Sequence, residues 1–329
     1  MKSFEYIRAK DAKQAIADVA FPEAKFLGGG TNLIDLMKMG VEAPSRLVDI
    51  NRLTLATIQE LPTGGGLRIG ALARNSDVAE HPLIRSNYPL LREALLAGAS
   101  PQLRNLATVG GNILQRTRCY YFCDPAFPSC NKRDPGSGCG AIEGYNRIHA
   151  ILGHSRQCIA THPSDMCVAL AAFEAKIQVT GPSGTREIAF SEFHRLPGDT
   201  PERETELARN ELITAVDLPL VPLSATSIYL KVRDRASYAF ALVSVAALCE
   251  MDGKRFKKAR LALGGVAHKP WRALAAEKML EGNDASNELF AKAADAELKD
   301  ASAFPHNRFK IDLAKRSIVH ALQKVAATS

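Results

Sequence analysis

The fold is decided by the stretch that begins Thr108-Val109-Gly110-Gly111-Asn112 and ends Thr161-His162-Pro163-Ser164-Asp165. Between these ends lies a segment rich in proline and glycine that contains five cysteines: Cys119, Cys123, Cys130, Cys139 and Cys158. Clusters of proline and glycine are typical of irregular loops. The two polar ends therefore favour a site for an organic cofactor, and the loop between them favours a metal centre.

A second glycine loop lies upstream, in Phe26-Leu27-Gly28-Gly29-Gly30-Thr31-Asn32-Leu33-Ile34. Its apolar entry, three glycines and amphipathic continuation indicate a strand, a loop and a helix. Glycine lets the backbone approach a ligand closely, and the N–H groups at a helix start attract phosphate oxygens. The alternative is a tight turn, because the loop matches neither the dinucleotide-binding nor the P-loop motif. Two separated Gly/Thr/Asn loops suit the two ends of an extended diphosphate cofactor.

The composition is that of an ordinary globular protein, with 329 residues, 46% of them hydrophobic and 23% charged. This length allows two or three domains with a sizeable core. No stretch approaches the ~20 apolar residues of a membrane span. Residues 1–6 lack the apolar region of a signal peptide, so we expect none on this chain. The net charge is +7, but the basic residues are scattered apart from a predicted solvated turn at 254–258, so we expect no nucleic-acid binding.

The chain has seven cysteines, six of them between residues 119 and 167. Without a secretion signal, metal binding is favoured over a disulfide framework. No pair has the C-x-x-C spacing of zinc ribbons or bacterial ferredoxins, so the residues alone leave an iron–sulfur cluster, a zinc site and inert cysteines open. His149, His154 and His162 lie nearby, but a lone histidine is more often a surface or core residue than a ligand. Cys167 and Cys249 lie in apolar runs and are predicted core residues.

Helical and strand patterns alternate along the chain and predict an α+β protein. In the first part we expect a turn over 62–66, helices over 9–20 (capped by Asp11), 75–79 (capped by Asn75 or Ser76), 88–97 and 166–173, and strands over 47–50, 54–61, 67–71, 175–180, 185–190 and 211–218. A linker is expected at 221–227. The remainder predicts a separate small α/β domain, with strands over 227–232, 239–251 and 259–266 and helices over 271–280, 289–297 and 311–325.

Several short motifs are specific in combination: Leu27–Asn32, Ile69–Ala71, Arg104–Asn112, Ser164–Asp165, Leu263–Val266 with Pro270–Arg272, and Asn307–Ile311. With them, nearly the whole chain resembles the FAD-binding (medium) subunits of the molybdenum hydroxylases, the family of xanthine dehydrogenase and carbon monoxide dehydrogenase. The resemblance implies a vanillyl-alcohol-oxidase-type (PCMH) FAD-binding domain over 1–220, with subdomains 1–57 and 58–220 and a cysteine-rich insertion at 115–160. It also implies a small α/β C-terminal domain of the CO dehydrogenase flavoprotein type over 224–329.

The resemblance further implies where FAD lies. The diphosphate would be held by backbone N–H groups of one loop, formed by Phe26, Leu27, Gly28, Gly29, Gly30, Thr31, Asn32, Leu33 and Ile34, and flanked by Thr108, Gly111 and Asn112. Asp165 would accept hydrogen bonds from hydroxyls on the ribose or adenine side. Leu212 and Lys231 would lie near the isoalloxazine ring, where a cation stabilises the reduced anionic flavin. For Lys231, a surface lysine at a strand edge is the alternative.

The insertion resembles that of two branches, the periplasmic-type aldehyde oxidoreductases and 4-hydroxybenzoyl-CoA reductase, whose flavin subunits carry an extra [4Fe-4S] cluster. The phrases at Arg118–Phe122, Cys130–Arg133, Gly136–Cys139 and Gln157–Ala160 look like the aldehyde oxidoreductase branch. This resemblance implies Cys119, Cys130, Cys139 and Cys158 as cluster ligands. Cys123 is then an extra thiol.

The resemblance implies an electron-transfer subunit of a heterotrimeric molybdenum enzyme that oxidises an aldehyde to a carboxylic acid on another subunit. The implied partners are a [2Fe-2S] small subunit, a molybdenum-cofactor large subunit and an external electron acceptor. A 4-hydroxybenzoyl-CoA-reductase-like or xanthine-dehydrogenase-like enzyme is an alternative, and a zinc-stapled, non-redox FAD-binding scaffold is another. We expect the chain to be periplasmic by co-export with a signal-bearing partner, or else cytoplasmic.

Overall fold

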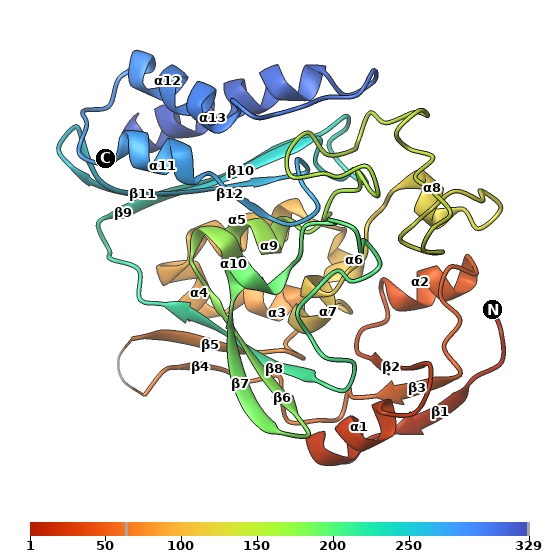
Figure 1. The fold of residues 1–329 in the computed structure, drawn as a ribbon. Helices are drawn as coiled ribbons and strands as arrows, with labels where there is room; N and C mark the ends of the chain where they lie inside the picture. The colour runs from red at the N-terminus through yellow and green to blue at the C-terminus, as the bar shows by residue number, and fades with distance from the viewer. Residues whose placement is uncertain (63–64, 328–329) are drawn as a thin grey trace.

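The computed structural model describes residues 1–62 and 65–327, and in this part of the chain the strands form three sheets (Figure 1). Thr63 and Gly64 of the predicted turn lie outside the described residues. The helices cover the sheets on several sides, and the cysteine-rich segment projects beside them.

The first sheet is parallel, in the order β1-β3-β2. Its strands are β1 (Glu5–Arg8), β2 (Ala24–Leu27) and β3 (Arg46–Asp49), with helices α1 (Ala12–Val19) and α2 (Leu33–Lys38) in the connections. Asp11 caps α1 by accepting a hydrogen bond from Gln14 N at 2.8 Å, as its position before the amphipathic run predicts. The upstream glycine loop lies where β2 ends and α2 begins, which confirms the predicted strand–loop–helix.

The second sheet is antiparallel, in the order β4-β5-β8-β6-β7. Its strands are β4 (Ile58–Glu60), β5 (Gly66–Gly70), β6 (Lys176–Gly181), β7 (Gly184–Ala189) and β8 (Leu212–Pro219). The helices beside it are α3 (Asn75–Glu80), α4 (Pro82–Asn87), α5 (Pro89–Ala97), α6 (Pro101–Arg104), α7 (Val109–Ile113), α9 (Asp165–Ala172) and α10 (Phe190–Phe193). Every residue of α9 is buried, including Cys167, as its apolar run predicts.

The cysteine-rich segment between α7 and α9 contains one short helix, α8 (Tyr120–Cys123), and is otherwise irregular. A small buried cluster joins Leu36 of α2 to residues of this segment, which include Cys119, Phe122, Cys130 and Cys158. The segment is therefore a packed loop structure with its own core.

The third sheet is antiparallel, in the order β12-β11-β10-β9. Its strands are β9 (Ala225–Val232), β10 (Val243–Asp252), β11 (Arg255–Gly264) and β12 (Trp271–Arg272), and its helices are α11 (Leu274–Leu280), α12 (Asn287–Glu297) and α13 (Phe309–Ala327). The three helices cover one face of this sheet, and α5 and α9 cover the other (Figure 1). No helix in the described residues is both long and apolar enough to cross a bilayer.

Several predicted element boundaries are wrong. Trp271 and Arg272, predicted to begin a helix, pair with Leu263 and Ala262 as an edge strand, and the Trp271 indole donates to Glu297 at 2.7 Å. The predicted solvated turn at 254–258 is mostly the start of β11, where Phe256 is fully buried. The helix at Asn75 is preceded by Arg74, and neither Asn75 nor Ser76 is its N-cap. In each case a tertiary contact overrides the local preference.

Candidate functional site

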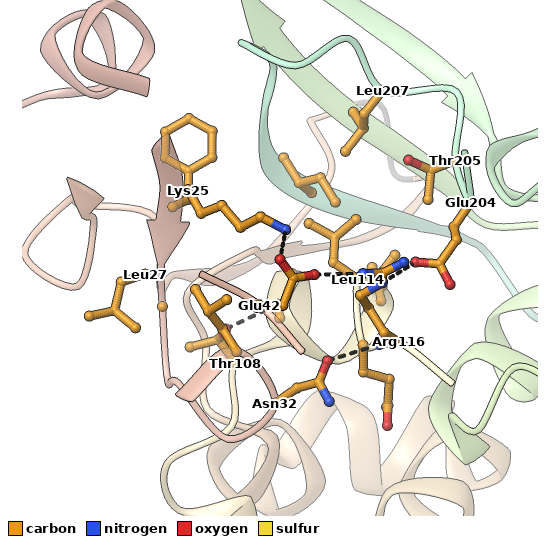
Figure 2. Close-up of a pocket in the computed structure, with 18 of the residues that line it drawn as sticks. Lys25, Leu27, Asn32, Glu42, Thr108, Leu114, Arg116, Glu204, Thr205 and Leu207 are labelled. Atoms are coloured by element: carbon orange, nitrogen blue, oxygen red, sulfur yellow. Dashed lines mark hydrogen bonds and ion pairs between the residues drawn. The ribbon is translucent and has the colours of Figure 1, made fainter. Parts of the chain in front are cut away.

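A cavity of about 700 Å³ lies where the two glycine loops meet (Figure 2). Its size falls in the range of small-molecule sites, roughly 300–1,000 Å³. Most of the predicted cofactor residues line it, namely Phe26, Leu27, Gly28, Gly29, Gly30, Thr31, Asn32, Leu33, Thr108, Gly111 and Leu212. These residues come from distant parts of the chain, so the cavity exists only in the folded molecule.

The glycines are required by the close packing of the two loops. A Cβ atom on Gly29 would lie 2.1 Å from the carbonyl oxygen of Leu106, so any side chain there would collide with backbone. Gly30 has φ +73°, a left-handed conformation that favours glycine. The predicted ligand loop is therefore also a contact between loops.

Two polar side chains outside the glycine motifs hold the loops together. Asn51, just after β3, donates through Nδ2 to the carbonyl oxygen of Gly28 at 2.9 Å and accepts at Oδ1 from Arg74 at 3.1 Å. The Arg74 guanidinium also donates to the Leu106 carbonyl. Sequence reasoning missed both residues, because neither lies in a recognisable motif.

Asn32 offers an unused donor beside the cavity. Its Oδ1 accepts from the backbone N–H of Arg116 at 2.9 Å, which fixes the orientation of the amide. Its Nδ2 is buried and has no hydrogen-bond partner among the described residues. A buried amide donor without a partner is costly, so this group suits a ligand that brings an acceptor oxygen.

The remaining predicted cofactor residues lie elsewhere. Ile34 is behind the loop, with its side chain close to Gly30, and Asn112 accepts at Oδ1 from Ser164 Oγ at 2.6 Å. Asp165 is buried and accepts from the Tyr229 hydroxyl and from Lys231 Nζ, each at 2.7 Å. The Lys231 ammonium also donates to the carbonyl oxygen of Ala97, at 2.9 Å.

A second cavity of about 430 Å³ adjoins the first. Thr161 and His162 line both, and Asp165 lines the second, together with Arg118, Tyr120 and residues of the β9–β10 connection. The two cavities therefore adjoin at Thr161 and His162.

His162 and His194 form part of the wall between the cavities and the core. Together with Cys167 they form a group whose potential metal-ligand atoms all lie within 4.8 Å of one another. Among the described residues it is the one group of three or more His, Cys, Asp or Glu side chains that lie this close. Both rings meet the carbonyl oxygen of Ile113 through Nε2, at 3.4 and 3.0 Å. Burial lowers the pKa of His194 to about 4 and that of His162 well below its usual range, so both rings are neutral at pH 7. We interpret the group as part of the cavity wall.

The cysteine segment brings four of its five thiols to one place. Cys119, Cys130, Cys139 and Cys158 line the same small space, and Cys123 does not. Cys130 and Cys139 are paired across an isolated antiparallel bridge, and no disulfide joins the cysteines of the described residues. The four residues that the resemblance implies as ligands are therefore neighbours in space.

The spacing of these thiols is wider than a single ion requires. No three of them lie within 4.8 Å of one another in the part of the chain that the structure describes. Zn–S bonds of about 2.3 Å would place tetrahedral sulfurs about 3.8 Å apart. A four-iron cluster holds its thiolates farther apart, because each one binds a different iron.

Three of the four thiols, those of Cys119, Cys139 and Cys158, lie in a protein environment that raises their pKa and so disfavours their charged form. Burial raises the pKa of Cys158 to about 11 and raises that of Cys119 further. His149 Nε2 lies 3.1 Å from Cys119 Sγ, a contact that sequence reasoning missed. A bound metal centre would supply the positive charge that thiolates need here.

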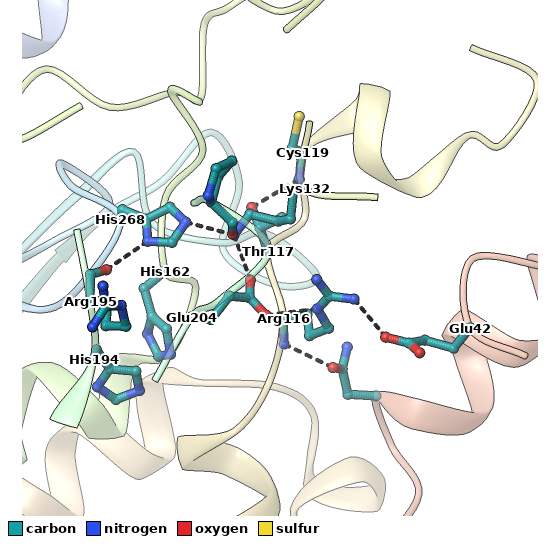
Figure 3. A network of polar contacts seen from close by, with 12 residues as sticks. Glu42, Arg116, Thr117, Cys119, Lys132, His162, His194, Arg195, Glu204 and His268 are labelled. Carbon is teal, nitrogen blue, oxygen red and sulfur yellow. Dashed lines mark hydrogen bonds and ion pairs between the residues drawn. The ribbon is translucent and has the colours of Figure 1, made fainter. Parts of the chain in front are cut away.

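A chain of charged side chains connects the two regions (Figure 3). The Lys132 side chain is 1% exposed, and those of Glu42, Arg116 and Glu204 are 10%, 19% and 25% exposed. Lys132 of the cysteine segment donates to Glu204 Oε1 at 2.8 Å, and Glu204 Oε2 accepts from Arg116 Nε at 2.7 Å. Arg116 in turn donates to Glu42 at 2.6 Å. Burial alone would raise the pKa of Glu204, but Lys132 and Arg116 lower it to about 2. Sequence reasoning missed these contacts, since no local pattern indicates the distant partners of Glu204.

Two family models cover the chain. Residues 2–221 match the FAD binding domain in molybdopterin dehydrogenase, and residues 228–325 match the CO dehydrogenase flavoprotein C-terminal domain. The chain therefore belongs to the FAD-binding medium subunits of the molybdenum hydroxylase family. This confirms the predicted family, the predicted α+β fold with its two kinds of domain, FAD as the cofactor, and the assignment as an oxidoreductase subunit.

Among individual proteins, the chain is 52% identical over 331 residues to the aldehyde oxidoreductase FAD-binding subunit PaoB of Escherichia coli K12, with 99% of each chain covered. It is 27% identical to the carbon monoxide dehydrogenase medium chain of Afipia carboxidovorans, covering 88% of this chain and 84% of that one. The solved carbon monoxide dehydrogenase of Hydrogenophaga pseudoflava superposes with a TM-score of 0.78 at 26% identity, covering 99% and 98% of the two chains. Quinoline 2-oxidoreductase from Pseudomonas putida 86 shares the fold, with a TM-score of 0.75 at 23% identity over 100% of this chain and 99% of that one.

Proposed function

We propose that this chain is the FAD- and [4Fe-4S]-containing electron-transfer subunit of a heterotrimeric molybdenum aldehyde oxidoreductase. Aldehyde oxidation would take place on a partner subunit that holds the molybdenum cofactor. This chain would lie on the electron path from a [2Fe-2S] partner to an external acceptor. The observation that carries the proposal is the full-length, 52% identity to an aldehyde oxidoreductase FAD-binding subunit.

The first cavity fits the diphosphate part of FAD. Its glycine-lined wall and the unpartnered Asn32 amide suit phosphate oxygens. We assign this contact to the predicted loop from Phe26 to Leu33, with Thr108 and Gly111 opposite. FAD, when bound, supplies the capacity to accept and release electrons.

Asp165 and Lys231 are two buried charges near the second cavity, and we assign them different roles. Asp165 would contact the ligand, and Lys231 would not. Asp165 lines that cavity, so it remains our candidate for a contact with FAD. Lys231 pairs with Asp165, and its side chain is only 6% exposed, so it is not the surface lysine of the alternative interpretation. We propose that Lys231 acts by holding the Asp165 carboxylate in place.

The cluster proposal is supported by the donor set. Four thiols share one space, and their spacing exceeds that of a zinc site. Sulfur-only ligands suit iron–sulfur clusters. We propose Cys119, Cys130, Cys139 and Cys158 as the ligands and Cys123 as an extra thiol, which lies 3.9 Å from the carbonyl oxygen of Thr117.

The partners and the location of the enzyme follow from the same proposal. A [2Fe-2S] small subunit and a molybdenum-cofactor large subunit would complete the heterotrimer. We propose that the complex is periplasmic by co-export with a signal-bearing partner, or else cytoplasmic. Copurification of three subunits in equal amounts tests the assembly, and fractionation of cells tests the location.

The cofactor content is tested by measuring iron, zinc and acid-labile sulfide per FAD in the anaerobically purified chain, with low-temperature EPR after reduction. We expect about four irons and four sulfides per FAD, as one [4Fe-4S] centre requires. Zinc without sulfide would instead favour the non-redox scaffold. Aldehyde, xanthine and aromatic acyl-CoA turnover by the assembled enzyme distinguishes the alternative reaction classes.

Substitution of single cysteines tests the ligand set. Cys158→Ser is expected to lose most of the iron, because its thiol lines the shared space. Cys123→Ser is expected to keep the iron and its EPR signal, and it serves as the matched control from the same segment. Loss of iron from Cys123→Ser with retention in Cys119→Ser would exchange these two ligands.

A further inference from the structure

We propose that the partly buried ion chain Lys132–Glu204–Arg116 couples the two cofactor sites, so that a filled cysteine site strengthens the retention of FAD. This inference rests on the proposed function, because it takes the four cysteines as the ligands of a cluster. It goes beyond that function in assigning an energetic link between the sites to three named residues.

The first observation is that the two sites share a wall. Arg116 and Thr117 line the first cavity, and Cys119 and Phe122 line the space of the four thiols. The Thr117 hydroxyl accepts from the backbone N–H of Cys119 at 3.2 Å. One short backbone segment therefore contacts both sites.

Lys132 extends from the cysteine side into this wall. Its side chain is 1% exposed, and Nζ meets three acceptors, the carbonyl of Pro201 at 2.7 Å, Glu204 at 2.8 Å and His268 Nε2 at 2.6 Å. His268 Nδ1 lies 2.8 Å from the carbonyl of Arg195, which sets that nitrogen as the donor and leaves Nε2 to accept. The ammonium thus uses all three of its donors.

The position of Lys132 depends on Cys130. The backbone N–H groups of Arg133 and Asp134 both donate to the Cys130 carbonyl, at 2.9 and 2.8 Å, so Lys132 lies within one tight turn of that cysteine. A change in the geometry of Cys130 would therefore move the Lys132 side chain. Filling or emptying the thiol site is such a change.

On the FAD side, Arg116 contacts both Glu204 and the glycine loop. Its guanidinium is hydrogen-bonded to Glu204 and Glu42, and its Cζ lies 4.5 Å from the centre of the Phe122 ring. Its backbone N–H holds Asn32 Oδ1, and this bond aims the free Asn32 amide. The chain of contacts thus begins beside Cys130 and ends on Asn32, a residue proposed to bind FAD. Figure 3 shows its middle part, Lys132, Glu204 and Arg116.

The charges in this chain alternate, and this is the physical reason for coupling. Lys132 and Arg116 are cations, and Glu204 and Glu42 are anions. Removing one member of a buried ion pair leaves its partner unpaired, and the neighbours must rearrange. A displaced Lys132 would therefore disturb Glu204, Arg116 and the loop at Asn32 in turn.

The test is a thermodynamic cycle on the full chain with FAD as the probe. The FAD dissociation constant is measured for wild type and Lys132→Met, each with its cluster and after the cluster has been removed under anaerobic chelation. In wild type, we expect cluster removal to weaken FAD binding on the order of tenfold, within the usual range of coupling between sites. In Lys132→Met, we expect weaker binding with the cluster present and little further change after its removal.

The controls separate coupling from simple destabilisation. Lys176→Met breaks an exposed ion pair with Glu187 and should leave the cycle as in wild type. If Lys132→Met does not fold, Glu204→Gln serves in its place, because it keeps the side-chain shape while removing the negative charge. Equal FAD affinity with and without the cluster in wild type would overturn the inference and leave the proposed function intact. Absence of iron from the purified wild type would overturn the cluster assignment and this inference with it.

Discussion

Gly29 is a single residue on which the cofactor site depends. Gly29→Ala would place a Cβ atom 2.1 Å from the Leu106 carbonyl oxygen, so the two glycine loops would have to separate. We expect FAD to be lost or bound at least tenfold more weakly, which corresponds to about 1.4 kcal/mol. Flavin fluorescence titration measures this. Gly28→Ala is the matched control and should have a milder effect, since its Cβ would approach the Thr108 side chain, with the hydroxyl at 3.1 Å, and not the backbone.

Glu204 should make the free energy of unfolding depend on pH in the acid range. Its pKa is about 2 in the folded chain, compared with 4.5 for an ordinary glutamate, because Lys132 and Arg116 outweigh the effect of burial. A lowered pKa stabilises the folded state above pH 4.5, and this contribution is lost as pH falls from 4.5 toward 2. It amounts to about 3 kcal/mol as an upper value.

Urea unfolding of wild type and Glu204→Gln at several pH values measures this contribution. Wild type should be more stable at pH 6, and the difference should shrink as the pH approaches 3. A constant difference over this range would contradict the assignment. Glu288→Gln, which breaks the exposed pair with Lys292, should change stability little at any pH, because solvent screens an exposed ion pair.

At the scale of elements, α13 is attached to the cysteine segment by two side chains from its first turn and the residues before it. Lys310 Nζ is fully buried and donates to the carbonyl oxygens of His149, at 2.8 Å, Ile148 and Gly265. Asn307 Nδ2 donates to the carbonyl of Ala150 at 3.1 Å. The terminal motif that contributed to the family resemblance therefore anchors the backbone next to His149.

This anchor predicts a second dependence of stability on pH, in the alkaline range. Burial, with a smaller contribution from Arg147, lowers the pKa of Lys310 from 10.5 to about 7. The folded chain therefore binds fewer protons than the unfolded chain between these values, and stability should rise with pH from about 7 to about 10.5. Lys310→Met should lose this rise and, at pH 8, destabilise the chain by about 1–3 kcal/mol through unpaired carbonyls. An unchanged slope of stability between pH 7 and pH 10 would contradict this prediction.

At the scale of the whole molecule, the third sheet is packed between two cores. On β10, Val245, Ala247 and Cys249 belong to the core with α11–α13, and Ala246 and Leu248 belong to the core with α5 and α9. The third sheet therefore contributes side chains to both cores, one on each of its faces. We expect the full chain to unfold in a single calorimetric transition, because neither part keeps its core without the other. Two well-separated transitions would contradict this expectation.

The family, the kinds of domain and the glycine loops could be predicted from the sequence alone. Glycine runs, an amphipathic continuation and an apolar strand are local features, and a local pattern is enough to predict a strand–loop–helix. The buried positions of Cys167 and Cys249 also follow from apolar runs in the chain. These residues behave as predicted because their neighbours in sequence define their surroundings.

Only the tertiary structure decided how distant side chains are paired. The family resemblance had already implied the four thiols, and the structure places them around one space without Cys123. The pairing of Lys231 with Asp165 appears only in the fold. The fold also joined Lys132 to Glu204, residues separated by 72 positions in the chain. Such pairs have no sequence signature, because a buried ion pair depends on how distant loops pack and not on the spacing of residues along the chain.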